Sequence, residues 1–520
     1  MASQFYLPGK GFTYLIMFGE KESPRYIPAL RAINHYELEN SGGYDAQYYA
    51  QIAMRPWLSN RALQAAVDSL PYRARRILFC WTAYGLAWGD PARALHIYAV
   101  QNIVCWLALA VLLLRWFPME SWENFVRWVG VLFSFGMCFS VRGSLVDGPS
   151  LLLIAGGVAL AEAGRRWWSA ALLGVAGLGK ETNILAGATF APPRFGDWRG
   201  WLRETGRWLL VVSPLVIWVV VLQIWLGRAG DAGARNFDWP FAAYFRKWQE
   251  TIAELRSADP DVFTKWSVVM LVALTVQWLF FALRPRWDLP WWRIGAAYSV
   301  LMIFLGDAVW EGFPGAASRV LLPMALAFNV LVPRRHLGWF LALLAGNLTV
   351  LMASDTLRSP GRESFELEGP RELRMVAATG RVVEAVFDEH WYPPEKSWLE
   401  FWRWSNGSGK IVLRNPHPFT VVADISFGLR ANDARRVNVK QDGKTLVHAA
   451  LAESQQNEIV LENIRLEPGE TSWLFETDAP AAFPVTDELR RIAFSLRNYK
   501  IKLRGKAEPL ASPAPPAPAP

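Results

Sequence analysis

Cysteine is scarce in this sequence, and the few cysteines follow no functional spacing. Cys80, Cys105 and Cys138 are the three cysteines among 520 residues, and each lies in an apolar segment. This pattern is neither a disulfide framework nor the spacing of a metal site. We interpret the three residues as small apolar side chains in helix packing.

Apolar runs of membrane-spanning length are absent from both ends of the chain. After residue 354 no segment could cross a bilayer, so we expect a soluble domain there. Near the N-terminus the run GFTYLIMFG (11–19) has nine residues, which is too short to span and unlike a signal peptide. Either a first helix is missing because the start of the chain is set too late, which we favour, or the segment 77–92 has an unusual role.

Between these ends the chain is strongly apolar. Hydrophobic residues make up 52% of the sequence and 28 residues are tryptophan, which argues against an ordinary soluble protein. The predicted fold is mainly α, a polytopic membrane helical bundle. Its predicted spans are 95–114, 126–141, 145–162, 208–226, 266–283, 291–309, 317–332 and 337–353.

The net charge of +8 reflects arginines that are grouped in short loops between the apolar runs. The positive-inside rule places these loops on the cytoplasmic face, so the charge reports topology and we expect no nucleic-acid partner. The opposite face then carries the loops 227–265 and 310–318 and everything after residue 354. The basic loops contain Arg115, Arg127, Arg165, Arg166, the stretches 194–207 and 284–293, Arg334 and Arg335.

One apolar segment, WWSAALLGVAGLGKETNILAGATFAP (167–192), has basic loops on both sides. If both loops are cytoplasmic, the segment is a re-entrant hairpin of two half-helices. About 14 residues at 1.5 Å each reach only about 21 Å, which is less than a bilayer crossing. Lys180 and Glu181 then lie at the tip, which must line protein or a watery cavity.

The C-terminal part changes to a two-residue periodicity with frequent turn signals. It predicts a small all-β sandwich on the outer face, with a hairpin turn at Asp442-Gly443. The predicted organisation is an N-terminal segment 1–94, a membrane domain 95–355, an aromatic-rich connector 356–408, the sandwich 409–504 and a disordered Pro/Ala tail 505–520. We interpret the connector tryptophans as interfacial anchors, with stacking on sugar rings as the alternative.

The stretch GGYDAQYYAQIA (42–53) places one carboxylate among aromatic and amide side chains in a predicted outer loop. A loop Asp is most often merely solvated. Helical spacing, however, puts Asp45, Tyr48 and Tyr49 on one side, and with Tyr44 and Gln47 they form a surface that suits sugars. Asp45 is therefore the candidate catalytic residue, and the other four are candidate substrate-binding residues.

Several basic residues on the same predicted side are candidates for phosphate binding. Arg73, Arg75 and Arg76 stand where topology does not explain positive charge, and Arg319 lies at the outer end of a span. Arginine matches phosphate oxygens bidentately. Contact with anionic lipid headgroups is the alternative for the first three.

Charged residues in the apolar segments are further candidates for substrate binding. Lys180 and Glu181 each cost about 2.5–3.5 kcal/mol at membrane depth unless they are paired or hydrated. A pair in which they neutralise each other is the alternative. Asp147 is also a candidate, although a structural ion pair with Arg142 is the default expectation for it.

Together these residues fit the transfer of a sugar from a lipid-linked phosphate at the membrane surface. The phosphate leaving group is held by Arg or Lys, and Asp45 deprotonates the acceptor hydroxyl as general base. The sequence contains no cluster of metal ligands, so we expect no required cofactor. A divalent metal beside the phosphate is nevertheless compatible with the sequence.

GYDAQYYAQIA resembles the first outer-loop motif of bacterial membrane proteins in the GT-C superfamily of polyprenyl-phosphate-sugar-dependent glycosyltransferases, which includes mannosyltransferase-type members. The segments PYRARRIL, LVDGPSLLL, GLGKETNILA and SRVLLPMALAFN also resemble this family, and the similarity covers about 40–355. It implies a bacterial inner-membrane protein with a periplasmic active site, inverting transfer to a cell-envelope acceptor and the loop Asp as base. The sugar and the acceptor do not follow from these motifs.

Two functions from other classes stay open. A transporter or flippase of lipid-linked glycans would share the polar residues but would not need Asp45 as a base. A non-catalytic membrane anchor would present the sandwich to cell-envelope glycans.

Overall fold

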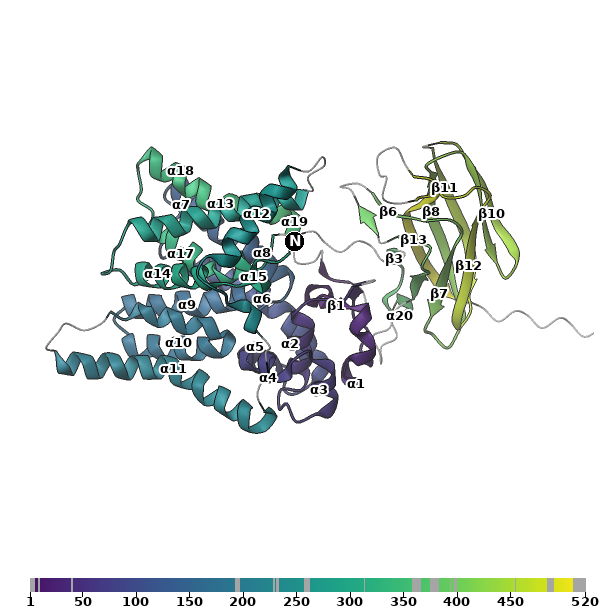
Figure 1. Ribbon diagram of the computed structural model, residues 1–520. Helices are drawn as coiled ribbons and strands as arrows, with labels where there is room; N and C mark the ends of the chain where they lie inside the picture. The colour runs from purple at the N-terminus through teal and green to yellow at the C-terminus, as the bar shows by residue number, and fades with distance from the viewer. Residues whose placement is uncertain are drawn as a thin grey trace, which may run out of the picture.

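The computed structural model describes residues 5–7, 10–38, 41–191, 197–227, 230, 233–256, 262–312, 314–357, 366–374, 383–392, 394–396, 400–453, 455–483 and 491–507. A mainly helical domain extends to residue 357, and a β-sandwich begins at residue 366 (Figure 1). The prediction of a helical bundle followed by a small all-β domain is therefore confirmed.

Short elements form an N-terminal lobe over residues 10–86. Its longest helices, α2 (Ala46–Met54) and α5 (Leu78–Leu86), have nine residues each, so neither can cross a bilayer. The other elements of the lobe are η2 (Thr13–Ile16), β1 (Phe18–Gly19), η3 (Glu20–Arg25), α1 (Pro28–Arg31), β2 (Glu37–Leu38), α3 (Arg61–Ala66), α4 (Leu70–Arg73) and η4 (Ala74–Arg76).

Three helices are long and apolar enough to cross a membrane within the described part of the chain. They are α6 (Pro91–Leu113), α11 (Trp198–Leu226) and α13 (Val262–Leu283). A bent pair, α7 (Trp122–Leu132) and α8 (Phe135–Arg142), meets at 46° and makes a fourth candidate. The chain is thus a membrane protein by the length and composition of these helices.

The other predicted spans are helical but shorter than a crossing. The helix α9 (Asp147–Glu162) has 16 residues and α14 (Pro290–Phe304) has 15, which at 1.5 Å per residue reach about 24 and 23 Å. The last two predicted spans are divided by irregular turns. The remaining elements are η6 (Ala234–Asn236), α12 (Ala242–Leu255), α15 (Asp307–Trp310), α16 (Ala317–Val320), α17 (Leu322–Leu331), α18 (Leu337–Gly346), η7 (Leu348–Met352) and α19 (Ala353–Thr356).

The chain reverses direction between α9 and α11. The helix α10 (Arg166–Gly179) ends at Lys180, whose backbone is extended, and the 3-10 helix η5 (Glu181–Thr189) follows. The side-chain amide of Asn183 donates to the carbonyl of Ala176 at 2.8 Å and closes the turn.

Packing against α11 shows that η5 returns along the same path. Gly177 lies beside Leu215, whereas Gly187, further along the chain, lies beside Trp208. Later residues of α10 therefore contact later residues of α11, whereas η5 returns to contact earlier residues of α11. The two elements form a hairpin that stops short of a full crossing, because neither arm is long enough to span.

The basic loops gather at one end of the bundle, which we call the basic end. Arg115 pairs with Glu162 at 3.1 Å, and Arg334 donates to the carbonyl of Trp116 at 3.0 Å. Because α9 runs toward this end and α10 away from it, the start of α9 and the tip of the hairpin lie at the opposite end. We call that the polar end.

The sandwich has two sheets that share one core. The five-stranded sheet has the order β10-β9-β12-β7-β4, and the other sheet has β11-β8-β13-β6-β5 with β3 added to β13 in parallel. Buried and accessible residues alternate along the strands, as the sequence periodicity predicts. The strands are β3 (Glu366–Glu368), β4 (Glu384–Phe387), β5 (Glu395–Lys396), β6 (Phe401–Trp404), β7 (Gly409–Asn415), β8 (Val421–Ala431), β9 (Arg435–Gln441), β10 (Lys444–Leu451), β11 (Gln456–Leu466), β12 (Gly469–Thr477) and β13 (Phe494–Lys506), and a short helix α20 (Arg371–Arg374) lies among them in sequence.

The hairpin turn at Asp442-Gly443 is confirmed, since both residues have positive φ between β9 and β10. The sandwich also extends into the predicted connector, because β4 to β6 pair within its sheets. Trp391 is 5% exposed and packs edge-on against Phe475 and Phe494. This connector tryptophan is therefore a core residue, and not an interfacial anchor. The predicted tail begins too early, because Gly505 and Lys506 pair with β8 as the end of β13. Residues 508–520 of the predicted tail lie outside the described residues.

Candidate active site

Five segments that are distant in sequence meet at the polar end. They are the start of α2, the segment α4–η4, the start of α9, the tip of the α10–η5 hairpin and α16. We call their charged and phenolic side chains the polar cluster, which comprises Tyr44, Asp45, Tyr48, Tyr49, Asp68, Tyr72, Arg73, Arg75, Arg76, Asp147, Lys180, Glu181 and Arg319.

Asp147 neutralises two cations at the centre of the cluster. One carboxylate oxygen accepts a hydrogen bond from Lys180 Nζ at 2.6 Å, and the other accepts from Arg319 Nη1 at 3.1 Å. All three side chains are less than a tenth exposed. One negative charge thus serves two buried positive charges, and an added anion would complete their neutralisation.

Arg76 links the hairpin tip to the N-terminal lobe. It donates to Glu181 at 2.8 Å, to the Tyr49 hydroxyl at 2.9 Å and to the Tyr72 hydroxyl at 3.1 Å. Burial raises the pKa of the Tyr49 phenol, so this group stays a neutral hydroxyl that can donate a hydrogen bond. Arg75 lies over the Tyr72 ring at 5.7 Å, and no carboxylate in the described part of the chain forms an ion pair with it.

Arg73 stands between two carboxylates. Asp68 binds it bidentately at 3.0 and 2.7 Å, and Asp45 Oδ1 lies 3.0 Å from its Nη2 atom. The guanidinium also lies over the rings of Tyr48 and Tyr49. Asp45 Oδ2 has no hydrogen-bond partner among the described residues, and the Asp45 side chain is 36% exposed. One oxygen of this carboxylate is therefore fixed and the other is open.

Tyr44 connects the two halves of the cluster. Arg319 Nη2 donates to its hydroxyl at 2.8 Å, and the Arg319 guanidinium lies over the rings of Tyr44 and Phe139. Since Tyr44 precedes Asp45 in sequence, this contact places the carboxylate of Asp45 close to the cations around Asp147.

Most of the predicted site residues are brought together at this end. Gln47 lies apart from them, because it is 1% exposed and its side chain joins parts of the N-terminal lobe. Its Oε1 accepts from the Gly19 amide and from Tyr26, and its Nε2 donates to the carbonyl of Gly42. These contacts favour a structural role for Gln47.

One expected pairing and one alternative pairing are wrong. Asp147 does not pair with Arg142, whose guanidinium lies 3.6 Å from the centre of the Tyr14 ring and donates to the Tyr14 carbonyl. Lys180 and Glu181 do not neutralise each other, because the extended backbone at Lys180 turns successive side chains to opposite sides. Lys180 contacts Asp147 and Glu181 contacts Arg76 instead.

Asp68 and Tyr72 are not among the residues predicted from the sequence. Tyr72 lies within PYRARR, so its position beside the three arginines is a signal that points to it. The Tyr72 hydroxyl also accepts a hydrogen bond from Asn236 at 3.0 Å. Asp68 lies in a short loop before Arg73. A loop has no periodicity, so the sequence does not indicate that the Asp68 carboxylate contacts Arg73.

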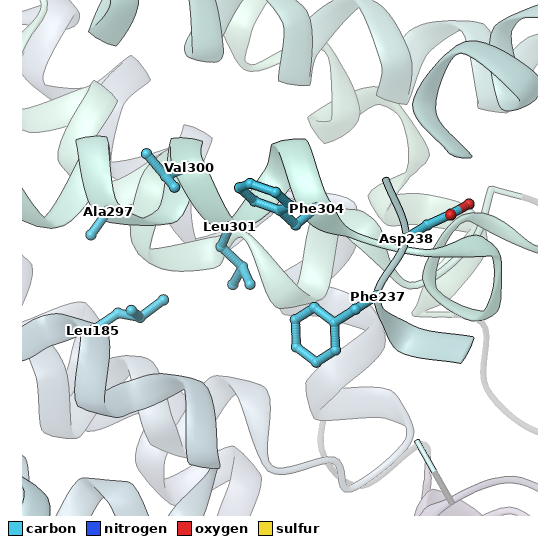
Figure 2. Close-up of a pocket in the computed structure, with 7 residues that line it drawn as sticks. All are labelled: Leu185, Phe237, Asp238, Ala297, Val300, Leu301 and Phe304. Atoms are coloured by element: carbon cyan, nitrogen blue, oxygen red, sulfur yellow. The ribbon is translucent and has the colours of Figure 1, made fainter. Parts of the chain in front are cut away.

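An apolar pocket of about 360 Å³ lies beside the hairpin (Figure 2). Leu185 of η5 forms one wall, and a stripe of α14 side chains forms the other. The Tyr298 hydroxyl donates to the carbonyl of Thr182 and ties α14 to the start of η5. Val300 and Phe304 are both exposed, so the pocket is open on the outer surface of the bundle. The lining residues are Leu185, Phe237, Asp238, Ala297, Val300, Leu301 and Phe304.

The described residues include no group of three or more His, Cys, Asp or Glu side chains that could hold a metal ion. The carboxylates of the polar cluster pair with arginine and lysine instead. The cluster can therefore bind an anion through its own cations, beside a carboxylate with one open oxygen.

No protein-family model and no curated protein matches this sequence. Among solved structures, the chain is similar to the arabinosyltransferase EmbB from Mycobacterium smegmatis, determined by single-particle cryo-EM, with a TM-score of 0.28 and 10% identity. The similarity covers 79% of this chain and 58% of that chain, so this chain spans little more than half of its length. A similarity this low assigns neither a fold family nor an activity.

Proposed function

We propose that this protein is a membrane glycosyltransferase that transfers a sugar from a polyprenyl-phosphate donor to an acceptor hydroxyl. The observation that carries the proposal is the polar cluster, in which cations outnumber carboxylates around an Asp with one open oxygen. The five cations are Arg73, Arg75, Arg76, Lys180 and Arg319, and the four carboxylates are Asp45, Asp68, Asp147 and Glu181.

The phosphate of the donor is proposed to bind where positive charge is incompletely neutralised. Lys180 and Arg319 share the single carboxylate of Asp147, and no carboxylate among the described residues forms an ion pair with Arg75. Charge-assisted hydrogen bonds from such groups to phosphate oxygens are strong. They also stabilise the negative charge that develops on the leaving phosphate.

Asp45 is proposed to act as the general base. The acceptor oxygen forms a bond with the anomeric carbon of the sugar while the bond from that carbon to the phosphate oxygen breaks. The hydroxyl proton passes to Asp45 Oδ2, and polyprenyl phosphate leaves with the electron pair. Attack opposite to the leaving group inverts the anomeric centre. Arg73 fixes Oδ1 of Asp45 and so orients the open oxygen.

The apolar pocket between η5 and α14 suits the isoprenoid chain of this donor. Its lining is almost entirely hydrocarbon and aromatic (Figure 2). It opens to the outer surface of the bundle, where Val300 and Phe304 are exposed. Leu185 in its wall belongs to the 3-10 helix that begins at Glu181, so a lipid along the pocket would end near the cluster. The charged head and the apolar chain would thus each meet matching chemistry.

The distribution of charge supports an orientation for the reaction. With the basic end in the cytoplasm, the polar cluster and the N-terminal lobe lie on the extracytoplasmic side of the membrane. We propose a bacterial inner membrane, a cell-envelope glycan as acceptor and the sandwich on the same side as the cluster. The chain's own cations supply the positive charge, so the proposed reaction needs no cofactor.

The test is transfer of radiolabelled sugar from a panel of polyprenyl-phosphate sugars, in membranes that contain equal amounts of wild type or Asp45→Asn. Transfer by the wild type should fall by a factor of about 10² or more in Asp45→Asn. Undiminished transfer by the variant would remove Asp45 as the base. No transfer from any donor, together with export of a lipid-linked glycan, would favour the transporter.

Two control variants separate the role of Asp45 from general damage. Asp68→Asn also removes a carboxylate from Arg73, so it should lower transfer less than Asp45→Asn if Asp45 accepts the proton. Glu22→Gln changes a carboxylate of the same lobe that pairs with Arg25 at the surface, and it should leave transfer unchanged.

A further inference from the structure

Four apolar and aromatic residues lie together at one corner of the N-terminal lobe. Trp88 is 90% exposed, Trp57 69% and Leu86 66%, and the Trp57 ring lies edge-on to Tyr84 with their centres 6.2 Å apart. Tyr84 also lies against the backbone of Gly89, just after Trp88. We call Trp57, Tyr84, Leu86 and Trp88 the aromatic corner.

The backbone at this corner is strained. Trp88 has φ of 53°, in the left-handed region that a bulky side chain rarely adopts. Strain of this kind persists only where the surrounding structure enforces it, and it is frequent at functional positions. Here it turns a large indole outward at the point where the chain passes from α5 to α6.

The corner is continuous with surfaces that face lipid. Trp88 lies three residues before Pro91, the first residue of α6, whose apolar side chains Val104, Leu107 and Val111 are exposed. On its other side α5 contacts the spanning helix α11, where the rings of Trp81 and Trp218 meet edge-on at 4.9 Å. The corner thus lies at the end of one spanning helix and is joined through α5 to another.

We infer that the aromatic corner inserts into the leaflet of the bilayer at the polar end, and that its partner is lipid at the boundary between headgroups and acyl chains. Tryptophan and tyrosine are enriched at that depth, because their rings are apolar and their N–H or O–H groups can reach water. Exposed Arg55 and Arg93 flank the corner in sequence and suit contact with anionic headgroups.

Insertion at this corner would also fix the depth of the polar cluster. The Cys80 thiol of α5 donates to the carbonyl of Tyr49, and the Trp218 indole donates to the carbonyl of Ala74 beside Arg76. The segment 77–92 is then a half-inserted element that holds the N-terminal lobe against the membrane. This inference does not depend on the proposed reaction.

The test uses the full chain in nanodiscs of phosphatidylcholine and phosphatidylglycerol. Trp88→Cys carries an environment-sensitive fluorophore, and Trp57→Cys is a second reporter in case the first variant is unstable. Gln64→Cys is the matched control, because Gln64 is an exposed residue of α3 in the same lobe. The helix α3 lies farther from the bundle than α5 (Figure 1). Unmodified protein labelled in parallel corrects for the three native cysteines.

A nitroxide on the lipid near the carbonyl level should quench the label at residue 88 about threefold more than the label at residue 64. Aqueous iodide should show the opposite order. Equal iodide quenching at both positions would place the corner in water and overturn the inference. Protection of the label at residue 88 from both quenchers would also overturn the inference, because protein and not lipid would then cover the aromatic corner. If that protection were lost in nanodiscs that hold one chain each, the covering protein would be a second copy of this chain.

Discussion

The two ends of the helical bundle both carry many arginines, but they hold them in different surroundings. At the basic end Arg115 and Arg334 are exposed, and they pair with Glu162 and with a backbone carbonyl. Arg127 at the same end is buried, but its contacts are one carboxylate, Glu123, and backbone carbonyls, with no phenol among the described residues. At the polar end Arg76 and Arg319 are largely buried, and each contacts both a carboxylate and a phenol. Exposed pairs contribute at most about 1 kcal/mol, whereas burying a cation needs compensation. Burial alone therefore does not indicate a binding site. The polar end differs because its buried cations share carboxylates and also contact phenols.

The sharpest contrast between the ends is expected in transfer activity. Arg319→Met should lower transfer by a factor of about 10², because it removes one of the two cations that share Asp147 and are proposed to hold the leaving phosphate. Arg115→Met should change transfer less than twofold, on the order of what an exposed pair contributes. Both variants are compared at matched expression in the radiolabel assay. Equal losses of transfer activity in the two variants would contradict the proposed difference between the two ends.

The ends should also differ in stability. Asp147→Leu leaves Lys180 and Arg319 buried without their carboxylate and should destabilise the fold by about 3 kcal/mol, whereas Glu162→Leu at the basic end should cost less than about 1 kcal/mol. Thermal unfolding in nanodiscs measures both. The double variant Asp147→Leu/Lys180→Leu should be more stable than Asp147→Leu alone, since it removes one of the orphaned cations. A double variant that is less stable would contradict this account.

A milder change separates charge from geometry within the polar end. Arg319 contacts Asp147 and Tyr44 through two different nitrogens, and lysine has only one. Arg319→Lys should therefore raise the KM for the donor about tenfold and change kcat little, as expected for lost binding geometry with retained charge. A fall in kcat with unchanged KM would assign Arg319 to the chemical step.

The smallest effect is expected from removal of metal. Because the cations of the polar end face the proposed phosphate site, EDTA treatment should leave the rate of transfer unchanged. Loss of transfer that Mg²⁺ or Mn²⁺ restores would show that a divalent metal supplies part of the charge.

The sequence predicts the order of the helices and the sandwich well, because both depend on local hydrophobic periodicity. That Asp45, Tyr48 and Tyr49 share one side also follows, since helical spacing fixes it. Their contacts with Arg73 do not follow, because Arg73 lies on another element. The boundary of the sandwich does not follow from local patterns. Trp391 and the strands before residue 409 belong to it through pairings with distant strands.

The pairing of the buried charges could not be predicted from the sequence. Asp147 reaches Lys180 and Arg319, which are 33 and 172 residues away, instead of the nearby Arg142. Such contacts depend on how the helices pack, and local patterns do not encode them. Asp68 escaped prediction for a related reason, because a loop carboxylate has no periodicity that assigns it a direction.

The most direct test of the central claim separates donor binding from transfer in Asp45→Asn. A photoreactive, radiolabelled polyprenyl phosphate is crosslinked to wild type and variant, and transfer is measured in the same membranes. The account predicts equal crosslinking with transfer reduced by a factor of about 10² or more, because the phosphate site is intact and the base is lost. Transfer at the wild-type rate in the variant, with the lipid still bound, would contradict it.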